Sequence, residues 1–144
     1  MAKNVFGEDL QVCSADPMTG FFRTGRCETC GEDIGMHTVC AEMTAEFLAF
    51  SQKAGNDLST PVAHWRFPGL QPGDRWCLCL QRWVQAWHAG KAPRLILKAT
   101  HISAIEHIPM EVLLQAVQSD PGSAENWAAV FQALFSSLDF RFID

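Results

Sequence analysis

The sequence lacks the features that take a chain into a membrane or onto nucleic acid. None of its apolar runs approaches the roughly 20 residues that a membrane-spanning helix needs. Residues 1–9 hold no apolar run, so we expect no secretory signal. Lysine and arginine number 11 against 16 aspartates and glutamates, which leaves a formal net charge of −5 and no broad basic surface. We therefore expect a cytoplasmic protein that binds neither nucleic acid nor a membrane, and whose partner is a small molecule or another protein.

Two common catalytic signatures are also missing. There is no G-x-S-x-G pentapeptide, so a Ser-His-Asp hydrolase site has no local support. There is no glycine-rich loop of the kind that cradles phosphate. What the chain does have is 6 cysteines and 5 histidines. Because stable disulfides are rare in a reducing compartment, we expect the cysteines to be core residues, metal ligands or reactive thiols.

Helical signals are clear in the middle and the end of the chain. Thr44 is a good N-cap, and Gly55 is a good stop for the helix that follows it. A second helix, with an apolar stripe of tryptophan and leucine, is predicted over residues 74–89. A third begins at Pro109, where the missing N–H of proline costs nothing. A fourth begins at Ser123, after a Pro-Gly break.

The remaining segments are turns and short strands. Residues 4–40 are rich in turn formers and have little helical period. Short extended segments are predicted over residues 21–23 and 37–40, and a buried strand over residues 94–99. The chain of 144 residues, 48% of them hydrophobic, is large enough for one real core. We predict an α+β fold with about four helices packed on a small sheet of short strands, and a turn-rich N-terminal third.

The most specific pattern of potential metal ligands is C-x2-C-x6-H-x2-C. It consists of Cys27, Cys30, His37 and Cys40. A C-x2-C turn brings two thiolates to one side, and tetrahedral zinc needs four such donors. Gly31 directly after the second cysteine suits the positive φ of a knuckle turn. These four residues are therefore predicted metal ligands, with zinc as the candidate cofactor, against the alternative that the cysteines are simply buried.

A second pair of thiols, Cys77 and Cys79, lies in the sequence W-C-L-C. On a helix these two side chains would point roughly 200° apart, so they could not share a metal. Cys79 would then be a core residue, and Cys77, near the helix start, would have a lowered pKa and act as a nucleophile. If the segment is extended instead, both thiols share one face.

Histidines and carboxylates complete a possible thiol-based site. His101 lies at the end of the predicted strand, in the kind of loop that often carries function. An aspartate in a turn can orient an imidazole, and Asp57 and Asp33 both occupy turns. We therefore predict a catalytic set with one thiolate, one base or ligand and one orienting carboxylate. The candidates are Cys40 or Cys77 for the first, His37 or His101 for the second, and Asp57 or Asp33 for the third.

Several stretches taken together resemble the bacterial family catalogued as domain of unknown function 2237, over about residues 4–117. They include Thr19-Gly20-Phe21, Gly35-Met36-His37-Thr38-Val39-Cys40-Ala41, Phe47-Leu48-Ala49-Phe50-Ser51, Gly55-Asn56-Asp57-Leu58-Ser59-Thr60-Pro61, the long run from Phe67-Pro68-Gly69 to Trp76-Cys77-Leu78-Cys79, and Ala99-Thr100-His101. The resemblance supplies no activity. It implies counterparts in the family for seven residues of this chain: Cys13, Cys27, His37, Cys40, Cys77, Cys79 and His101.

The resemblance also changes the predicted site. The family usually has glycine where this chain has Cys30, so a shared site would join Cys27, His37 and Cys40 with Cys77 or His101. It divides the chain into a family-like α+β domain, residues 1–118, and a helical extension packed on it, residues 119–144. Two functions follow. One is a metal-binding or thiol-based enzyme with a Cys/His pocket. The other is a non-catalytic binding module for a partner protein or small ligand, with purely structural cysteines.

Overall fold

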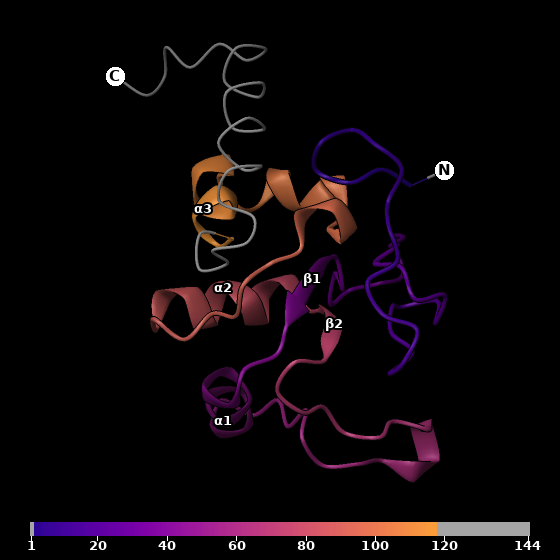
Figure 1. The fold of residues 1–144 in the computed structure, drawn as a ribbon, viewed down its shortest axis with the longest axis vertical. Coiled ribbons are helices and arrows are strands. Elements are labelled where there is room, and N and C mark those ends of the chain that lie inside the picture. The colour runs from indigo at the N-terminus through magenta and orange to yellow at the C-terminus, as the bar shows by residue number, and fades with distance from the viewer. Residues whose placement is uncertain (1, 118–144) are drawn as a thin grey trace.

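The computed structural model describes residues 2–117, which form an α+β fold around a two-stranded antiparallel sheet. The strands pair Cys40 with Cys77 and Ala41 with Trp76 at their centre. In Figure 1 the sheet lies at the centre, with α1 and α2 on one side and the indigo N-terminal third on the other. The elements in chain order are β1 (Val39–Glu42), α1 (Ala45–Lys53), η1 (Ala63–Trp65), β2 (Arg75–Leu78), α2 (Leu80–His88), η2 (Leu97–Ala99), η3 (Ile102–Glu106) and α3 (Met110–Gln115).

The first predicted helix is confirmed at both ends. The Thr44 hydroxyl accepts a hydrogen bond of 3.0 Å from the Phe47 N–H, which satisfies one of the free donors of the first turn. After the last helical residues the chain turns away at Gly55, whose φ of +100° favours glycine. The predicted stop of the second helix is also confirmed, since Gly90 has a φ of +73° just after α2.

The predicted start of the second helix is wrong. Residues 75–78 form β2, and α2 begins only at Leu80. The Asp74 carboxylate does not cap a helix; it accepts the Gln71 N–H at 2.9 Å and closes the preceding turn. Pairing with β1 gives these residues a full set of cross-strand partners, which outweighs the helical periodicity of the segment.

Two of the predicted strands do not form. The Arg23 N–H donates to the Gly20 carbonyl at 3.0 Å, and Arg23 has a φ of +55°, so residues 21–23 are a turn. In residues 94–99 only a single bridge forms, between Leu95 and Ala41. The Thr100 hydroxyl then donates to the Ile96 carbonyl at 2.9 Å, and this local bond accompanies the bend into η2.

Three α-helices lie within residues 2–117, and the predicted fourth helix and C-terminal extension lie outside the described residues. As predicted, Pro109 stands at the beginning of α3, as its N-cap. The extended segment predicted over residues 37–40 forms as β1, but the strand starts only at Val39.

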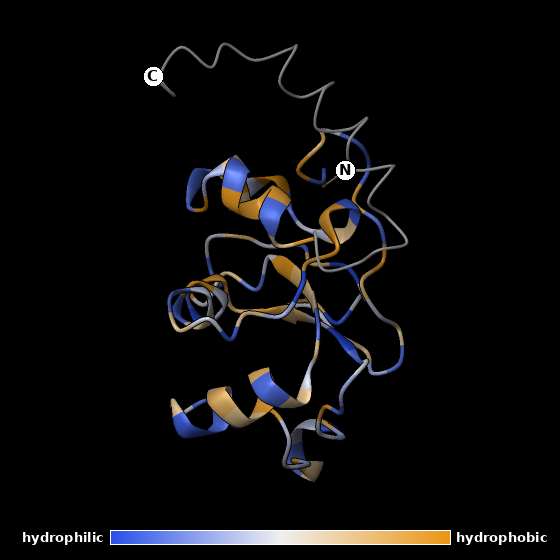
Figure 2. Ribbon diagram, turned by 60° about the vertical axis from the view of Figure 1, so that its left-hand side comes forward, coloured by the Kyte–Doolittle hydropathy of each residue, from blue (hydrophilic) through white to orange (hydrophobic). Residues whose placement is uncertain are grey.

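A hydrophobic core joins the sheet to the helices. Trp83 of α2 and Phe47 of α1 are among its largest fully buried side chains. The Trp83 indole N–H is satisfied by the Pro93 carbonyl at 2.9 Å, so the ring is buried without an unpaired donor. Figure 2 shows hydrophilic and hydrophobic residues mixed along each helix, as expected for helices with one buried face.

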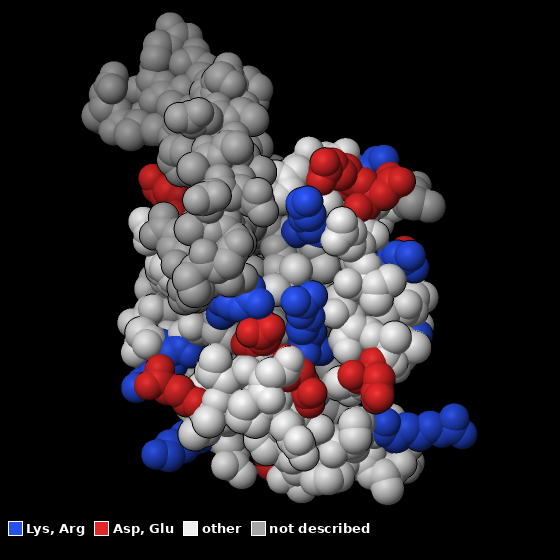
Figure 3. Space-filling view, viewed as in Figure 1, with Lys and Arg blue, Asp and Glu red and all other residues white. Residues whose placement is uncertain are grey.

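The surface carries charges of both signs. On the face drawn in Figure 3, lysine and arginine alternate with aspartate and glutamate, and they form no single basic patch. Within residues 2–117 no helix has the length and apolar character needed to cross a membrane.

Candidate functional site

Four of the six cysteines form two disulfides, which corrects the expectation of free thiols. Cys13 is bonded to Cys40 and Cys27 to Cys77, while Cys30 is free and exposed. The predicted zinc knuckle is therefore not assembled. Two of its cysteines, Cys27 and Cys40, are bonded to different partners, and Cys30 faces solvent. Among residues 2–117 the only group of potential metal ligands with close donor atoms contains Cys13, Cys27 and Cys77.

The strand register explains why Cys40 and Cys77 are not the predicted nucleophiles. They are direct cross-strand partners, with exposures of 0% and 1%. Each is tied by its disulfide to a loop of the N-terminal third, so neither can act as a thiolate in this state. Cys77 also lies in a strand, so the helix terminus that would lower its pKa is absent at that position.

The structure joins His37 to Asp33, one of the two predicted orienting carboxylates. The imidazole Nδ1 lies 2.6 Å from Asp33 Oδ1. The other carboxylate oxygen accepts the His37 backbone N–H at 2.9 Å and the Thr29 hydroxyl at 3.0 Å. The Asp33 side chain is 0% exposed and that of His37 is 40% exposed. A buried carboxylate thus holds an imidazole that is open to solvent on its other side.

The electrostatics keep Asp33 ionised. Burial by itself raises the pKa of this carboxyl group, but hydrogen bonds from the His37 backbone, the His37 imidazole and Thr29 together outweigh it. The pKa of Asp33 therefore lies below its ordinary value. An ionised Asp33 accepts a hydrogen bond from Nδ1–H of the neutral imidazole, which leaves Nε2 of His37 with a free lone pair for a ligand or a reacting proton.

A tight turn brings these two residues together. The Met36 N–H donates to the Asp33 carbonyl at 3.0 Å, and Met36 has a φ of +49°. Gly35 lies against the imidazole, and a Cβ on it would be only 2.8 Å from His37 Cε1. The space for the imidazole therefore depends on glycine at residue 35.

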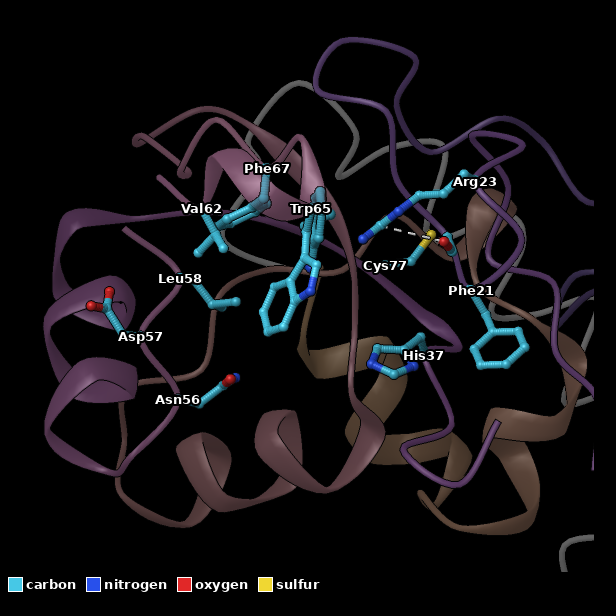
Figure 4. Close-up of a pocket in the computed structure, with 12 residues that line it drawn as sticks. Phe21, Arg23, His37, Asn56, Asp57, Leu58, Val62, Trp65, Phe67 and Cys77 are labelled. Carbon is cyan, nitrogen blue, oxygen red and sulfur yellow. Dashed lines mark hydrogen bonds between the residues drawn. The ribbon is translucent and has the colours of Figure 1, made fainter. Parts of the chain in front are cut away.

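His37 faces a cavity of about 290 Å³ with aromatic walls. Figure 4 shows Leu58, Trp65 and His37 around this space. Arg23 lies on the face of Trp76, 5.3 Å from the ring centroid, and its Nη1 donates to the Gly20 carbonyl at 3.4 Å, the dashed line in Figure 4. We call this space the aromatic cleft; its lining residues are Gly20, Phe21, Arg23, His37, Asn56, Asp57, Leu58, Val62, Trp65, Phe67, Trp76 and Cys77.

Backbone conformations that are unusual for non-glycine residues gather around the aromatic cleft. Arg23, Met36 and Arg66 have φ values of +55°, +49° and +53°. Arg23 lines the cleft, Met36 precedes His37, and Arg66 lines an adjoining cavity of about 350 Å³ that shares Trp65 with the cleft. Such conformations cost free energy and tend to cluster at functional sites.

Asp57 lines the aromatic cleft but does not orient His37. Its carboxylate accepts the Ser59 N–H at 2.9 Å, the Thr60 N–H at 3.2 Å and the Thr60 hydroxyl at 2.6 Å. The Thr60 hydroxyl and the Ser59 N–H are the main reasons that the pKa of Asp57 is lowered. Asp57 thus shapes the loop on one side of the cleft.

His101 has a different place in the fold. Its Nδ1 accepts the Ser103 N–H at 3.0 Å and caps η3, so it is not among the residues that line the aromatic cleft. Burial lowers the pKa of His101, and the nearby carboxylates of Glu106 and Glu28 offset this only in part.

The sequence predicts Cys79 to be a core residue, but the structure makes it a potential site residue. It is a free, partly exposed thiol at the N-cap of α2. Together with His37 and Arg82 it lines a third cavity, of about 240 Å³. The second helix is predicted to begin at residue 74, which assigns Cys79 to its buried face. The extended alternative for W-C-L-C was the signal that could have found it.

A comparison with known families covers the same part of the chain. The model of the family described as "Uncharacterized protein conserved in bacteria (DUF2237)" matches residues 3–117. The chain belongs to the DUF2237 family. No protein of curated function matches it. The match spans the Asp33–His37 pair, the four bonded cysteines and Cys79, so the whole candidate site lies within the DUF2237 region.

Proposed function

We propose that this DUF2237 protein is a small-molecule enzyme in which His37 transfers a proton within the aromatic cleft. The observation that carries the proposal is the buried, ionised Asp33 paired with the imidazole that lines the cleft. A carboxylate in this position fixes the tautomer and the ring orientation, as general acid–base catalysis requires. His37 would be the acid or base, and Asp33 a positioning residue.

The lining of the aromatic cleft favours a small, flat, anionic ligand. Trp65, Phe67 and Trp76 offer aromatic surface, which suits stacking against a planar molecule. Arg23 supplies a positive charge and several donors, which suit a carboxylate or a phosphate. The volume of about 290 Å³ lies near the lower end of the roughly 300–1,000 Å³ that ligand pockets occupy, so a small molecule fits best.

The third cavity, which Cys79 and His37 line together, favours a thiol-based form of the same enzyme. Cys79 would be the nucleophile, and His37 its base, in a Cys-His-Asp arrangement. This replaces Cys40 and Cys77 as the predicted thiolate, because Cys79 and Cys30 are the two cysteines outside the disulfides.

The proton-transfer proposal is tested by ligand binding and turnover. A panel of aromatic carboxylates and phosphates is screened by NMR, and bound ligands are assayed for hydrolysis and isomerisation. We expect the binding of a ligand to shift the His37 imidazole signals, and H37Q to lower turnover by roughly 10²–10⁴-fold. H107Q is the matched control. Equal turnover in H37Q and the wild type would refute acid–base catalysis by His37. If the wild type and H37Q bind the ligand equally well and neither turns it over, the result favours the alternative of a binding module with purely structural cysteines.

The thiol-based form has its own internal control. Iodoacetamide labelling at one fixed pH, followed by mass spectrometry, compares Cys79 with the more exposed Cys30. A His37-activated thiol should react faster than Cys30 in spite of its lower exposure, and H37Q should slow Cys79 alone. If Cys79 reacts more slowly than Cys30 in the wild type, its role as nucleophile is excluded.

A further inference from the structure

The four bonded cysteines form one buried cluster, which the proposed function does not use. Cys40 and Cys77 are opposite each other in β1 and β2. Their N–H groups do not bond across the sheet but donate to the hydroxyls of Thr100 and Thr19, at 3.2 and 2.9 Å. In an antiparallel sheet such a non-hydrogen-bonded pair has the shorter separation, about 4.5 Å between Cα atoms, and both side chains point to the same face.

The N-terminal loops add the other two sulfurs to this face. The Sγ atoms of Cys13, Cys27 and Cys77 all lie within 4.8 Å of one another. Cys40 Sγ is bonded to Cys13 Sγ, so the fourth sulfur belongs to the same cluster. The four cysteines have exposures of 0–4%, and they pack against Ala99 and, at the margin, Ile96.

We propose that this cluster is a zinc site in the reduced chain, with Cys13, Cys27, Cys40 and Cys77 as its four ligands. A tetrahedral zinc–thiolate centre has Zn–S bonds of about 2.3 Å, which places its sulfurs about 3.8 Å apart. Cys27 Sγ and Cys77 Sγ are bonded to each other and must separate on reduction, and Cys13 Sγ lies within 4.8 Å of both, so shifts of about an ångström reach this spacing. Four cysteines from the protein close the coordination shell, as in structural zinc sites.

The chemistry balances with a dithiol as reductant. Each disulfide takes two electrons and two protons from one dithiol, which itself becomes a disulfide. The four cysteine thiols then release their protons to solvent as they bind Zn²⁺. Four buried thiolates repel one another, and burying them without a counter-charge costs much free energy. The charge of Zn²⁺ offsets this cost.

Zinc and the two disulfides would perform the same structural task. Either one ties the loops that carry Cys13 and Cys27 to β1 and β2. Those loops flank the turn of Phe21 and Arg23, which forms one side of the aromatic cleft. The proposal does not rest on the proposed function, and the cleft would keep its shape in both redox states.

The test uses the full chain, purified without an affinity tag, reduced with dithiothreitol and desalted without oxygen. We expect one equivalent of bound zinc by mass spectrometry, and thiolate-to-metal absorption when cobalt replaces zinc. The oxidised chain should bind neither metal. The C30S/C79S double variant, which keeps the cluster, should bind like the wild type. C13S/C40S removes one disulfide and leaves the other, so it can be purified oxidised and then reduced. It should lose stoichiometric binding.

Four results would overturn the proposal. The first is less than about a tenth of an equivalent of zinc in the reduced wild type, since structural sites bind tightly. The second is full binding by reduced C13S/C40S. The third is loss of binding in C30S/C79S, which would move the site to the free cysteines. The fourth is a reduced chain that circular dichroism shows to stay unfolded with zinc.

Discussion

The substitution D33N tests the candidate site most directly, because it keeps the shape of the side chain and removes its charge. In the wild type, Asp33 Oδ2 accepts two hydrogen bonds, from the His37 N–H and the Thr29 hydroxyl, while Oδ1 accepts the imidazole Nδ1–H. Asparagine has one oxygen and one NH₂ group. If the oxygen keeps the first two donors, the NH₂ group faces Nδ1. Nδ1 must then become an acceptor, so the imidazole proton moves to Nε2.

D33N is therefore expected to invert the tautomer of His37. With its proton on Nε2, the imidazole cannot act as a base toward the aromatic cleft, and we expect turnover to fall by roughly 10²–10⁴-fold. The stability cost is smaller. Three charge-assisted hydrogen bonds become neutral ones, while the cost of burying a charge is removed, and the free energy of unfolding should fall by about 1–3 kcal/mol. T29V, which removes one neutral donor and leaves the imidazole bond, is the matched control and should not change the tautomer.

The assay is ¹⁵N NMR of the imidazole at neutral pH, together with urea unfolding at several pH values. The folded pKa of Asp33 is depressed from 3.8, so its contribution to stability is present above that value. It is lost as the pH falls through the lower folded pKa. The wild type should therefore lose its advantage over D33N in acid. The reasoning is refuted if wild-type His37 carries its proton on Nε2, or if D33N keeps it on Nδ1.

Three further predictions concern other parts of the fold. Burial depresses the pKa of His101 below 6.5, so as the pH drops the imidazole is protonated in the unfolded chain before it is protonated in the folded one. The free energy of unfolding should therefore fall as the pH drops from 6.5 through the folded pKa. H101N, which can still cap η3, should flatten this pH dependence in urea unfolding. G35A places a methyl group 2.8 Å from His37 Cε1, so the partly exposed imidazole must move and its NMR signals should shift, at a stability cost of about 1 kcal/mol; wild-type signals in G35A would contradict this. T44A removes the hydroxyl that accepts the Phe47 N–H and should cost about 1 kcal/mol in thermal unfolding without altering the His37 signals.

Local signals in the sequence predicted the elements that depend on local interactions. The helix between Thr44 and Gly55 needs only a capping hydroxyl and a residue that accepts positive φ, and both are visible in the sequence. Pro109 fixed the start of α3 for the same reason. The Asp33 turn was also readable, and it supplied one of the two candidate partners of His37.

At residues 75–78 the prediction from local signals is wrong, because pairing with a distant strand decides their structure. The segment has helical periodicity, and nothing within it indicates that Val39–Glu42, more than 30 residues earlier, will be its strand partner. The error carried over to the thiols. A helix made Cys77 a candidate nucleophile and Cys79 a core residue. In the structure Cys77 is buried in a disulfide, and Cys79, just after β2, is free and lines a cavity together with His37.

The sequence by itself determined the family, the α+β class and the turn that holds Asp33 four residues before His37. Only the tertiary structure decided which cysteines meet. Disulfide and metal geometry depend on sulfur positions to within an ångström or two. The bonded cysteines are separated by 27 and 50 positions in the chain, so they acquire such positions only when the sheet forms and the loops pack on it. The aromatic cleft arises in the same way, because its walls come from segments that touch only in the folded chain.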